Sequence, residues 1–242
     1  MIAYVAKDLR SGDRLSANEH ERLPAYSTIK VLLAAAFWRC VELGELDDAH
    51  QFEFEPVDSA GGSGVLRGFR HPANIALGDL AHLMLVVSDN DASNIIARLV
   101  GFERVNELGA ELGLRQTVMA RLMCDEQAVA AGRENHTSAE DLAALLEALA
   151  TGTHVSRFAC DAVWKSLEKQ EHVDGIARYL PRDATYAGKC GDDSPTSRHA
   201  HDCALIREGD RRIVMAVMTR DAGGFEPVSR TGAALYRALR GA

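Results

Sequence analysis

The run VLLAAAFW, residues 31–38, has no charged or strongly polar side chain on any side. A helix that is apolar all round has to lie inside a protein, with other elements around it. The run is far shorter than the ~18 apolar residues of a membrane span, and Arg39 ends it. We therefore expect residues 27–44 to form a buried helix at the centre of the fold.

Strand patterns occur at both ends of the chain. The segment IAYVAKDL and the turn after it predict a strand that enters a hairpin. Near the C-terminus, TYAGKCG, DCALIRE and RIVMAVMT predict three more strands, and a Gly209-Asp210 turn joins the last two. The closing segment VSRTGAALYRALRG predicts a helix.

Helical patterns fill the middle of the chain. Residues 78–87 and 91–101 predict two helices, with the tripeptide SDN (88–90) between them. Thr137 and Glu140 predict a capping box at the start of a further helix, whereas residues 115–136 have no clear period.

These patterns predict an α+β fold in which the N-terminal and C-terminal strands share one antiparallel sheet. We expect residues 1–26 and 166–242 to form a discontinuous α/β lobe that includes the sheet and the last helix. Residues 27–165 would form an all-helical lobe, and the two lobes would make one structural unit. A cleft between such lobes is the natural place for an active site.

Charge and cysteine content exclude several classes of function. The net charge is −8 and no basic block is present, which argues against nucleic acid as a partner. No segment resembles a membrane span or a secretion signal, so a cytoplasmic protein is expected. An odd number of cysteines without a C-x-x-C pair argues against a disulfide framework or a zinc site, and we expect no metal or other cofactor. The cysteines are Cys40, Cys124, Cys160, Cys190 and Cys203.

Three short motifs carry the candidate chemistry. Only five of the 27 basic residues are lysines, and two of these five lie in distinctive places. Lys30 follows Ser27 as Ser-x-x-Lys, and Lys189 begins KCG on a predicted strand. Each motif alone is weak, since any of them occurs by chance in chains of this length. Their order, with SDN between them, is much less common.

The set Ser-x-x-Lys, Ser-Asp-Asn and Lys-x-Gly resembles the signature of class A β-lactamases and penicillin-binding proteins. The segments STIKVLLAAAFWRCVELGEL and LGDLAHLMLVVSDNDASNIIARLVG resemble the two motif-bearing helical regions of that family throughout. The chain is thus similar to a class A β-lactamase-related serine hydrolase over nearly its whole length. The resemblance implies an α/β lobe and an all-helical lobe, in agreement with the order of strands and helices.

The motif residues suit acyl transfer. A serine hydroxyl is a poor nucleophile until a base takes its proton, so Ser27 is the candidate nucleophile and Lys30 the candidate base. Lys30 lies near the positive end of a helix dipole, and this position favours the neutral form of its amine. The resemblance implies that Ser88 relays a proton to the leaving nitrogen and that Asn90 binds the substrate.

The KCG strand supplies the remaining candidate residues. Lys189 would provide a positive field that keeps Lys30 neutral and attracts an anionic substrate. The resemblance also places Cys190, Gly191 and Asp192 at the substrate, with the backbone N–H groups of Ser27 and Asp192 as an oxyanion hole. Asn94 resembles a structural asparagine of the same region.

Cys190 departs from the family pattern, which has threonine or serine at this position. A thiol is a weaker hydrogen-bond donor than a hydroxyl, so the hydrogen bond to a substrate carboxylate would be weaker. Thr196, Ser197 or Arg198 are candidates to compensate. A reactive thiol at Cys190, beside Lys189, is a further alternative.

The deacylation motif Glu-x-x-Leu-Asn of efficient β-lactamases is absent from the matching stretch MARLMCDEQAVAAGREN. Arg121 matches the usual arginine, and Met123 then stands in the place of the glutamate. Asp125 and Glu126 lie close by in the sequence. They are either candidates for activating the deacylating water or a solvated pair on a loop.

The first hypothesis is a serine hydrolase that works through an acyl-enzyme, with β-lactamase-like hydrolysis of a small-molecule β-lactam amide. One alternative uses the same residues on an ester, another amide or a D-alanyl peptide. The other is a penicillin-binding sensor module that is acylated without turnover. Turnover separates an enzyme from a sensor, and substrate profiling separates the two enzymes.

Overall fold

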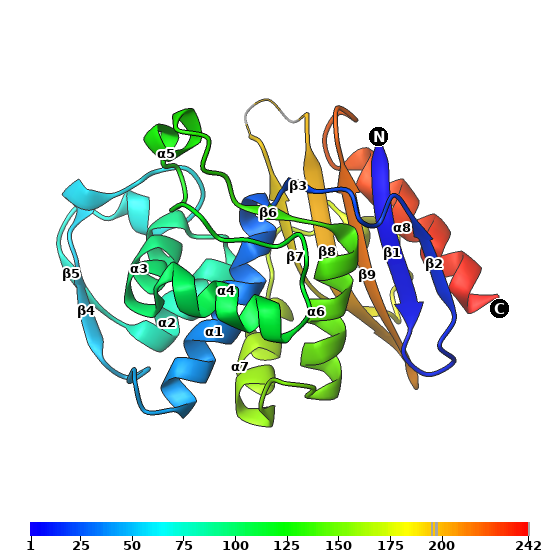
Figure 1. Ribbon diagram of the computed structural model, residues 1–242, viewed down its shortest axis with the longest axis horizontal. Helices are drawn as coiled ribbons and strands as arrows, with labels where there is room; N and C mark the ends of the chain where they lie inside the picture. The colour runs from blue at the N-terminus through cyan, green and yellow to red at the C-terminus, as the bar shows by residue number, and fades with distance from the viewer. Residues whose placement is uncertain (195, 197, 242) are drawn as a thin grey trace.

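The main sheet has five antiparallel strands in the order β2-β1-β9-β8-β7 (Figure 1). The structure, a computed structural model, describes residues 1–194, 196 and 198–241. The strands are β1 (Ile2–Asp8), β2 (Arg14–Ala17), β7 (Thr185–Asp192), β8 (Ala200–Glu208) and β9 (Arg211–Thr219). β1 pairs with β9 along its whole length, so the two ends of the chain meet in one sheet, as predicted.

Eight α-helices lie in the described ranges of the chain. They are α1 (Lys30–Glu42), α2 (Leu77–Val86), α3 (Asn90–Val100), α4 (Phe102–Glu111), α5 (Glu126–Ala130), α6 (Ala139–Thr151), α7 (Arg157–Leu167) and α8 (Glu226–Arg240). Four short strands make two small two-stranded sheets: β3 (Leu23–Pro24) with β6 (His136–Thr137), and β4 (Gln51–Phe54) with β5 (Ala73–Ala76). The 3-10 turns are η1 (Tyr26–Ile29), η2 (Pro56–Asp58), η3 (Leu66–Gly68) and η4 (Ile176–Tyr179).

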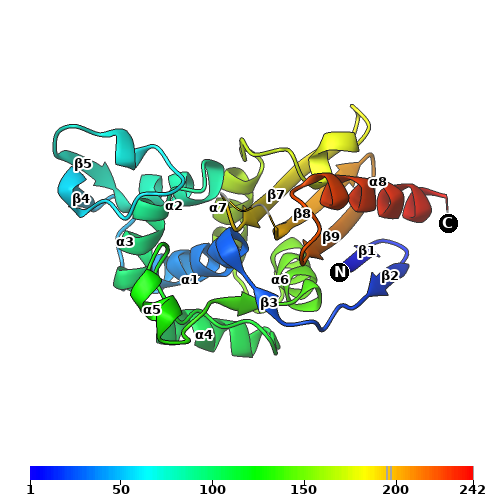
Figure 2. The same ribbon diagram turned by 90° about the horizontal axis from the view of Figure 1, so that it is seen from above.

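The sheet is covered on both faces (Figure 2). α8 packs on one face with Ala204 and Ile206 of β8, whereas Cys203 and Leu205 of the same strand belong to the core on the helical side. This alternation follows from the period of two in a strand. The predicted α+β class with an antiparallel sheet is confirmed.

α1 lies at the centre of the helical region, packed against α2, α3, α4 and α7, and its residues 30–37 are all buried. The prediction of a buried central helix is therefore confirmed, although the helix is shorter than residues 27–44. Ser27 belongs to the 3-10 turn η1 and not to α1. In a 3-10 helix residues three apart eclipse one another, so Ser27 and Lys30 still share one side.

Two details differ from the sequence patterns. The N-cap of α6 is Ser138, whose side chain accepts a hydrogen bond from Asp141 N, and not Thr137. Thr137 instead pairs through its hydroxyl with Thr117, because β6 continues up to that residue.

One continuous core joins β1, β7, β8 and β9 to the helices. The lobe boundaries at residues 26/27 and 165/166 stay a prediction.

Candidate active site

Ser27 lines a cleft with a volume of about 1080 Å³. Tyr26, directly before it, has φ +46°, a left-handed conformation that is uncommon for an aromatic residue. Such strain persists only where the surroundings enforce it, and it is frequent at functional sites. The turn η1 thus presents the serine at a constrained point of the chain.

Gly191 of β7 brings the strand backbone directly against η1. A Cβ atom at this position would lie 2.6 Å from Ser27 N and 3.1 Å from Thr28 N. Any other residue would push the strand away from the serine. The glycine of KCG is therefore required for the close approach of β7 to η1.

Lys30 is fully buried, and its amine lies among polar oxygen atoms. Nζ donates to the Ser88 carbonyl oxygen at 2.7 Å and to Asn90 Oδ1 at 2.9 Å, and it lies 3.2 Å from Ser88 Oγ. Burial, followed by the positive charge of Lys189, holds the pKa of Lys30 well below its usual range. A lysine with a lowered pKa is able to accept a proton at neutral pH.

The SDN tripeptide forms a tight loop because Asp89 satisfies three backbone donors. Its carboxylate accepts hydrogen bonds from Ala92 N, where it caps α3, and from Val65 N and Leu66 N, which follow the glycine-rich segment 59–64. Ser88 has φ +56° and is buried. The loop thereby holds the Ser88 hydroxyl at the amine of Lys30.

Asn90 joins the base to the opposite wall of the cleft. Its Oδ1 accepts from Lys30, while Nδ2 donates to Gly61 O at 3.2 Å and to Cys124 Sγ at 3.3 Å. Cys124 is exposed, lines the cleft and has φ +58°. No sequence motif singles out this thiol, because Asn90 and Cys124 are 34 residues apart in the chain.

Lys189 is fully buried, and its Nζ donates to the Cys190 carbonyl oxygen at 2.8 Å. Burial lowers its pKa as well. The Cys190 side chain is buried and does not line the described cleft, and burial raises the pKa of its thiol to about 11. A raised pKa disfavours the thiolate and so argues against a reactive thiol at Cys190.

The residues proposed to compensate for Cys190 have other partners or lie outside the description. Thr196 donates its hydroxyl to Asp193, and the Arg198 guanidinium pairs with Asp221, with Nε at 2.8 Å from Oδ1. Ser197 lies outside the described residues. The structure therefore brings neither Thr196 nor Arg198 to the cleft.

Carboxylates dominate the charged lining of the cleft. Burial, together with the neighbouring charge of Asp193, raises the pKa of Asp192. His172 also lines the cleft and lies close enough to Asp192 to lower that pKa. The charged lining comprises Asp125, Glu126, Glu171, Asp192 and Asp193, with Arg67 and Arg121 as the cations.

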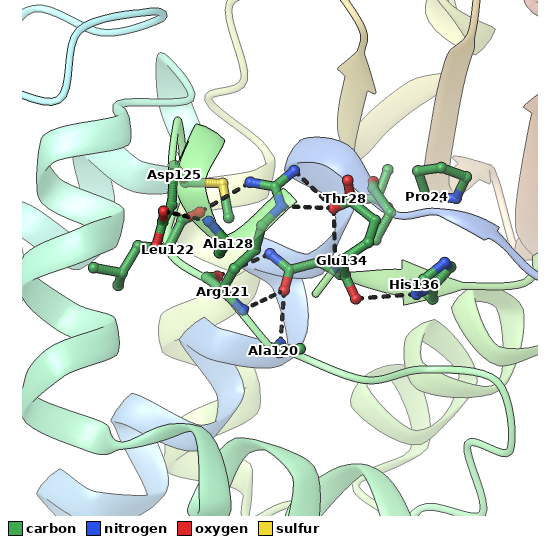
Figure 3. A network of polar contacts seen from close by, with 12 residues as sticks. Pro24, Thr28, Ala120, Arg121, Leu122, Asp125, Ala128, Glu134 and His136 are labelled. Carbon is green, nitrogen blue, oxygen red and sulfur yellow. Dashed lines mark hydrogen bonds and ion pairs between the residues drawn. The ribbon is translucent and has the colours of Figure 1, made fainter. Parts of the chain in front are cut away.

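An ion pair between Arg121 and Glu134 closes the loop 121–134 (Figure 3). Arg121 Nε donates to Glu134 Oε1 at 2.8 Å, and Asn135 Oδ1 accepts from Ala120 N and Arg121 N. Sequence reasoning missed Glu134, which lies in the segment without a clear period. Only its distance of 13 residues from Arg121 links the two in the sequence.

Within this loop the deacylation candidates differ in role. Asp125 Oδ1 caps α5 by accepting from Ala128 N at 2.8 Å, whereas Glu126 is exposed, and both line the cleft. Met123 also lines the cleft, and Asn94 binds its backbone through two hydrogen bonds, at 2.7 Å and 3.1 Å. Asn94 therefore acts as a structural residue of the loop.

No group of three or more His, Cys, Asp or Glu side chains is placed to hold a metal ion in residues 1–194, 196 and 198–241. All five cysteines are free thiols. None of the helices over the same residues has the length and apolarity to cross a membrane.

Residues 2–239 match the family model described as the beta-lactamase enzyme family. The chain belongs to the beta-lactamase enzyme family. Solved relatives agree with this assignment. A β-lactamase from Sphaerobacter thermophilus is 29% identical, with a TM-score of 0.89 over 99% of this chain and 90% of that one.

The chain is also similar to PBP-A and to a β-lactamase regulatory protein. PBP-A is 25% identical with a TM-score of 0.90, and the match covers 100% of this chain and 91% of PBP-A. A mutant of PBP-A was solved as an acyl-enzyme complex with penicillin G. A β-lactamase regulatory protein, BlaB of Streptomyces cacaoi, is 33% identical over 123 residues. That match covers 50% of this chain and 39% of BlaB, so the chain spans well under half of that curated relative.

Family and fold together support a serine hydrolase of the β-lactamase type or a regulatory sensor. Ser27, Asn90 and Asp192 line one cleft.

Proposed function

We propose that the protein is an acyl-transferring serine hydrolase that attacks a β-lactam amide through Ser27. The observation that carries the proposal is the state of Lys30. Its amine is fully buried, has a lowered pKa and lies at hydrogen-bond distance from the Ser88 hydroxyl, one 3-10 turn after Ser27. Burial favours the neutral form of this amine, and a general base requires that form.

In the proposed acylation, Ser27 Oγ attacks the carbonyl carbon while Lys30 Nζ accepts the hydroxyl proton. The N–H groups of Ser27 and Asp192 stabilise the oxyanion, and each such donor contributes about 3 kcal/mol. The C–N bond then breaks, and the proton passes from Lys30 through Ser88 Oγ to the leaving nitrogen. Lys189 acts through its field, and Asn90 orients both the lysine and the substrate.

Deacylation needs a base for water. In the described loop 121–134 the position of the family glutamate holds Met123, so we propose slow release of the acyl group. Asp125 and Glu126 line the cleft and are the carboxylates available to this step. Asp125 already caps α5, which leaves Glu126 as the less constrained candidate.

A sensor is the second candidate function, supported by Met123 at the glutamate position and by the similarity to the regulatory protein BlaB. An esterase or amidase of the same superfamily uses the same nucleophile and base on another substrate. The acidic lining of the cleft repels an anionic substrate and therefore favours that alternative.

Intact-protein mass spectrometry after mixing with penicillin G tests the proposal, with Ser27→Ala as control. We expect an adduct of the mass of the antibiotic that requires Ser27 and decays slowly. A permanent adduct would identify a sensor. If no adduct forms with penicillin G, the β-lactam assignment is wrong, and p-nitrophenyl esters then test the esterase alternative.

A further inference from the structure

The turn that carries Ser27 needs support from outside its own residues. Tyr26 holds a left-handed backbone conformation, and Gly191 leaves no side chain between β7 and the turn. Neither feature fixes how far the serine lies from the strand. Some group has to connect the segment before Ser27 to the sheet.

His201 of β8 occupies the place where such a connection would act. His201 is opposite Gly191 in the pairing of β7 with β8. Its side chain therefore points to the face of the sheet on which Gly191 approaches η1. The side chain is fully buried. A buried histidine requires partners for both ring nitrogens.

Both ring nitrogens of His201 have backbone partners. Thr219 N, at the end of β9, donates to Nδ1 at 3.2 Å, so Nδ1 carries no proton. Nε2 then bears the proton and donates to the Pro24 carbonyl oxygen at 3.0 Å. The two contacts select one neutral tautomer, and burial, which lowers the pKa of His201 to about 4, favours the same neutral form.

The imidazole also packs against the residue next to the nucleophile. Its ring centroid lies 5.4 Å from that of Tyr26, with the planes at 48°. His201 therefore contacts the chain at Pro24 and at Tyr26, on both sides of Ala25. The hydrogen bond to Pro24 and the ring contact with Tyr26 together hold the segment that leads into Ser27.

We propose that His201 is a positioning residue that fixes the Ser27 turn against β7. It links the end of β9 to the segment before the nucleophile, and so sets the spacing between Ser27 and the N–H of Asp192. The inference rests on the proposed acyl transfer at Ser27, since the spacing matters only for that reaction. Nothing in the mechanism above uses His201, which is not among the residues that line the cleft.

The test compares His201→Phe, which keeps a ring of similar size without hydrogen bonds, with His201→Gln, which keeps a donor for Pro24 O. Acylation of Ser27 is measured with penicillin G and with a fluorophosphonate probe that labels activated serines. Saturation kinetics separate the acylation rate constant from the affinity of the first, non-covalent complex. Thermal melting and near-ultraviolet circular dichroism report whether each variant is folded.

We expect the acylation rate constant of His201→Phe to fall at least tenfold, with the non-covalent affinity unchanged within about twofold. His201→Gln should recover most of the rate, which a role in packing alone does not explain. Should His201→Phe react at the wild-type rate, or His201→Gln be as slow as His201→Phe, the inference is wrong. If wild-type Ser27 reacts with neither probe, the proposed function fails and the inference falls with it.

A measurement that needs no activity covers the case in which His201→Phe does not fold. Nitrogen-15 spectra of wild-type protein labelled at histidine report the tautomer of His201. We expect a single tautomer with the proton on Nε2 at neutral pH. A mixture of tautomers, or a proton on Nδ1, would contradict the two contacts on which the inference depends.

Discussion

Replacing Lys30 with methionine tests the neutral base without any substrate. In the folded protein the amine is fully buried, and its pKa lies well below the ordinary value of 10.5 that it regains on unfolding. Between these two pKa values the unfolded chain binds one proton more than the folded one. The free energy of unfolding must then rise with pH across that window, and fall as the pH drops below 10.5.

The size of the effect follows from the single proton. One proton of difference gives a slope of about 1.4 kcal/mol per pH unit, and a fully buried group is not screened by solvent. Methionine has a similar volume and does not titrate, so the variant lacks this contribution. The Lys30→Met variant also loses the hydrogen bonds of the amine, which shifts its free energy of unfolding by a constant amount. The slope of that free energy with pH is unaffected by this shift.

We therefore expect the stability of the wild type relative to Lys30→Met to increase by about 1.4 kcal/mol per pH unit between about pH 8 and about pH 10. Urea unfolding followed by tryptophan fluorescence, in a reducing buffer, gives both curves. Ser27→Ala is the matched control, because it changes the adjacent turn without removing a titrating group. Parallel curves for wild type and Lys30→Met would show a charged lysine in the folded protein and would refute the assignment of Lys30 as base.

Three further substitutions probe the cleft. Met123→Glu should speed release of the acyl group from Ser27 by a factor of about 100 and leave acylation unchanged, as single-turnover mass spectrometry can show. Gly191→Ala places a methyl group 2.6 Å from Ser27 N, so urea unfolding should show a loss of about 1–3 kcal/mol and acylation should slow sharply. Asp192→Asn removes a carboxylate from the cleft, and acylation by anionic penicillin G should rise about fivefold. That gain should shrink as salt is added, because salt screens exposed charges.

Much of the fold follows from local patterns. The terminal strands, the apolar run of α1 and the loop between α2 and α3 all lie where periodicity and turn residues predict them. That the N-terminal and C-terminal strands share one sheet follows as well, because strands at both ends of a chain with a helical middle have few other partners. The exact cap of α6 was missed by one residue, since Thr137 and Ser138 are both good N-cap residues and only the end of β6 decides between them.

The supporting contacts of the site could not be predicted in the same way. The requirement for glycine at position 191 depends on the closeness of β7 to η1, which no local pattern encodes. His201 meets Pro24 only because β8 lies beside β7 in one register, 177 residues away in sequence. Motif spacing identifies candidate groups for the reaction, whereas the residues that position them depend on tertiary structure.

Different parts of the structure support the two halves of the proposed reaction. The groups assigned to acylation lie on η1, α1, β7 and the capped start of α3, elements held by the core and by backbone hydrogen bonds. The groups available to deacylation lie on the loop 121–134, which the Arg121–Glu134 pair closes. Asn94 binds residue 123 through its backbone alone, so these two hydrogen bonds do not depend on the side chain at position 123. We therefore expect a single side chain there to change how long the proposed acyl-enzyme lasts without changing the residues proposed to form it.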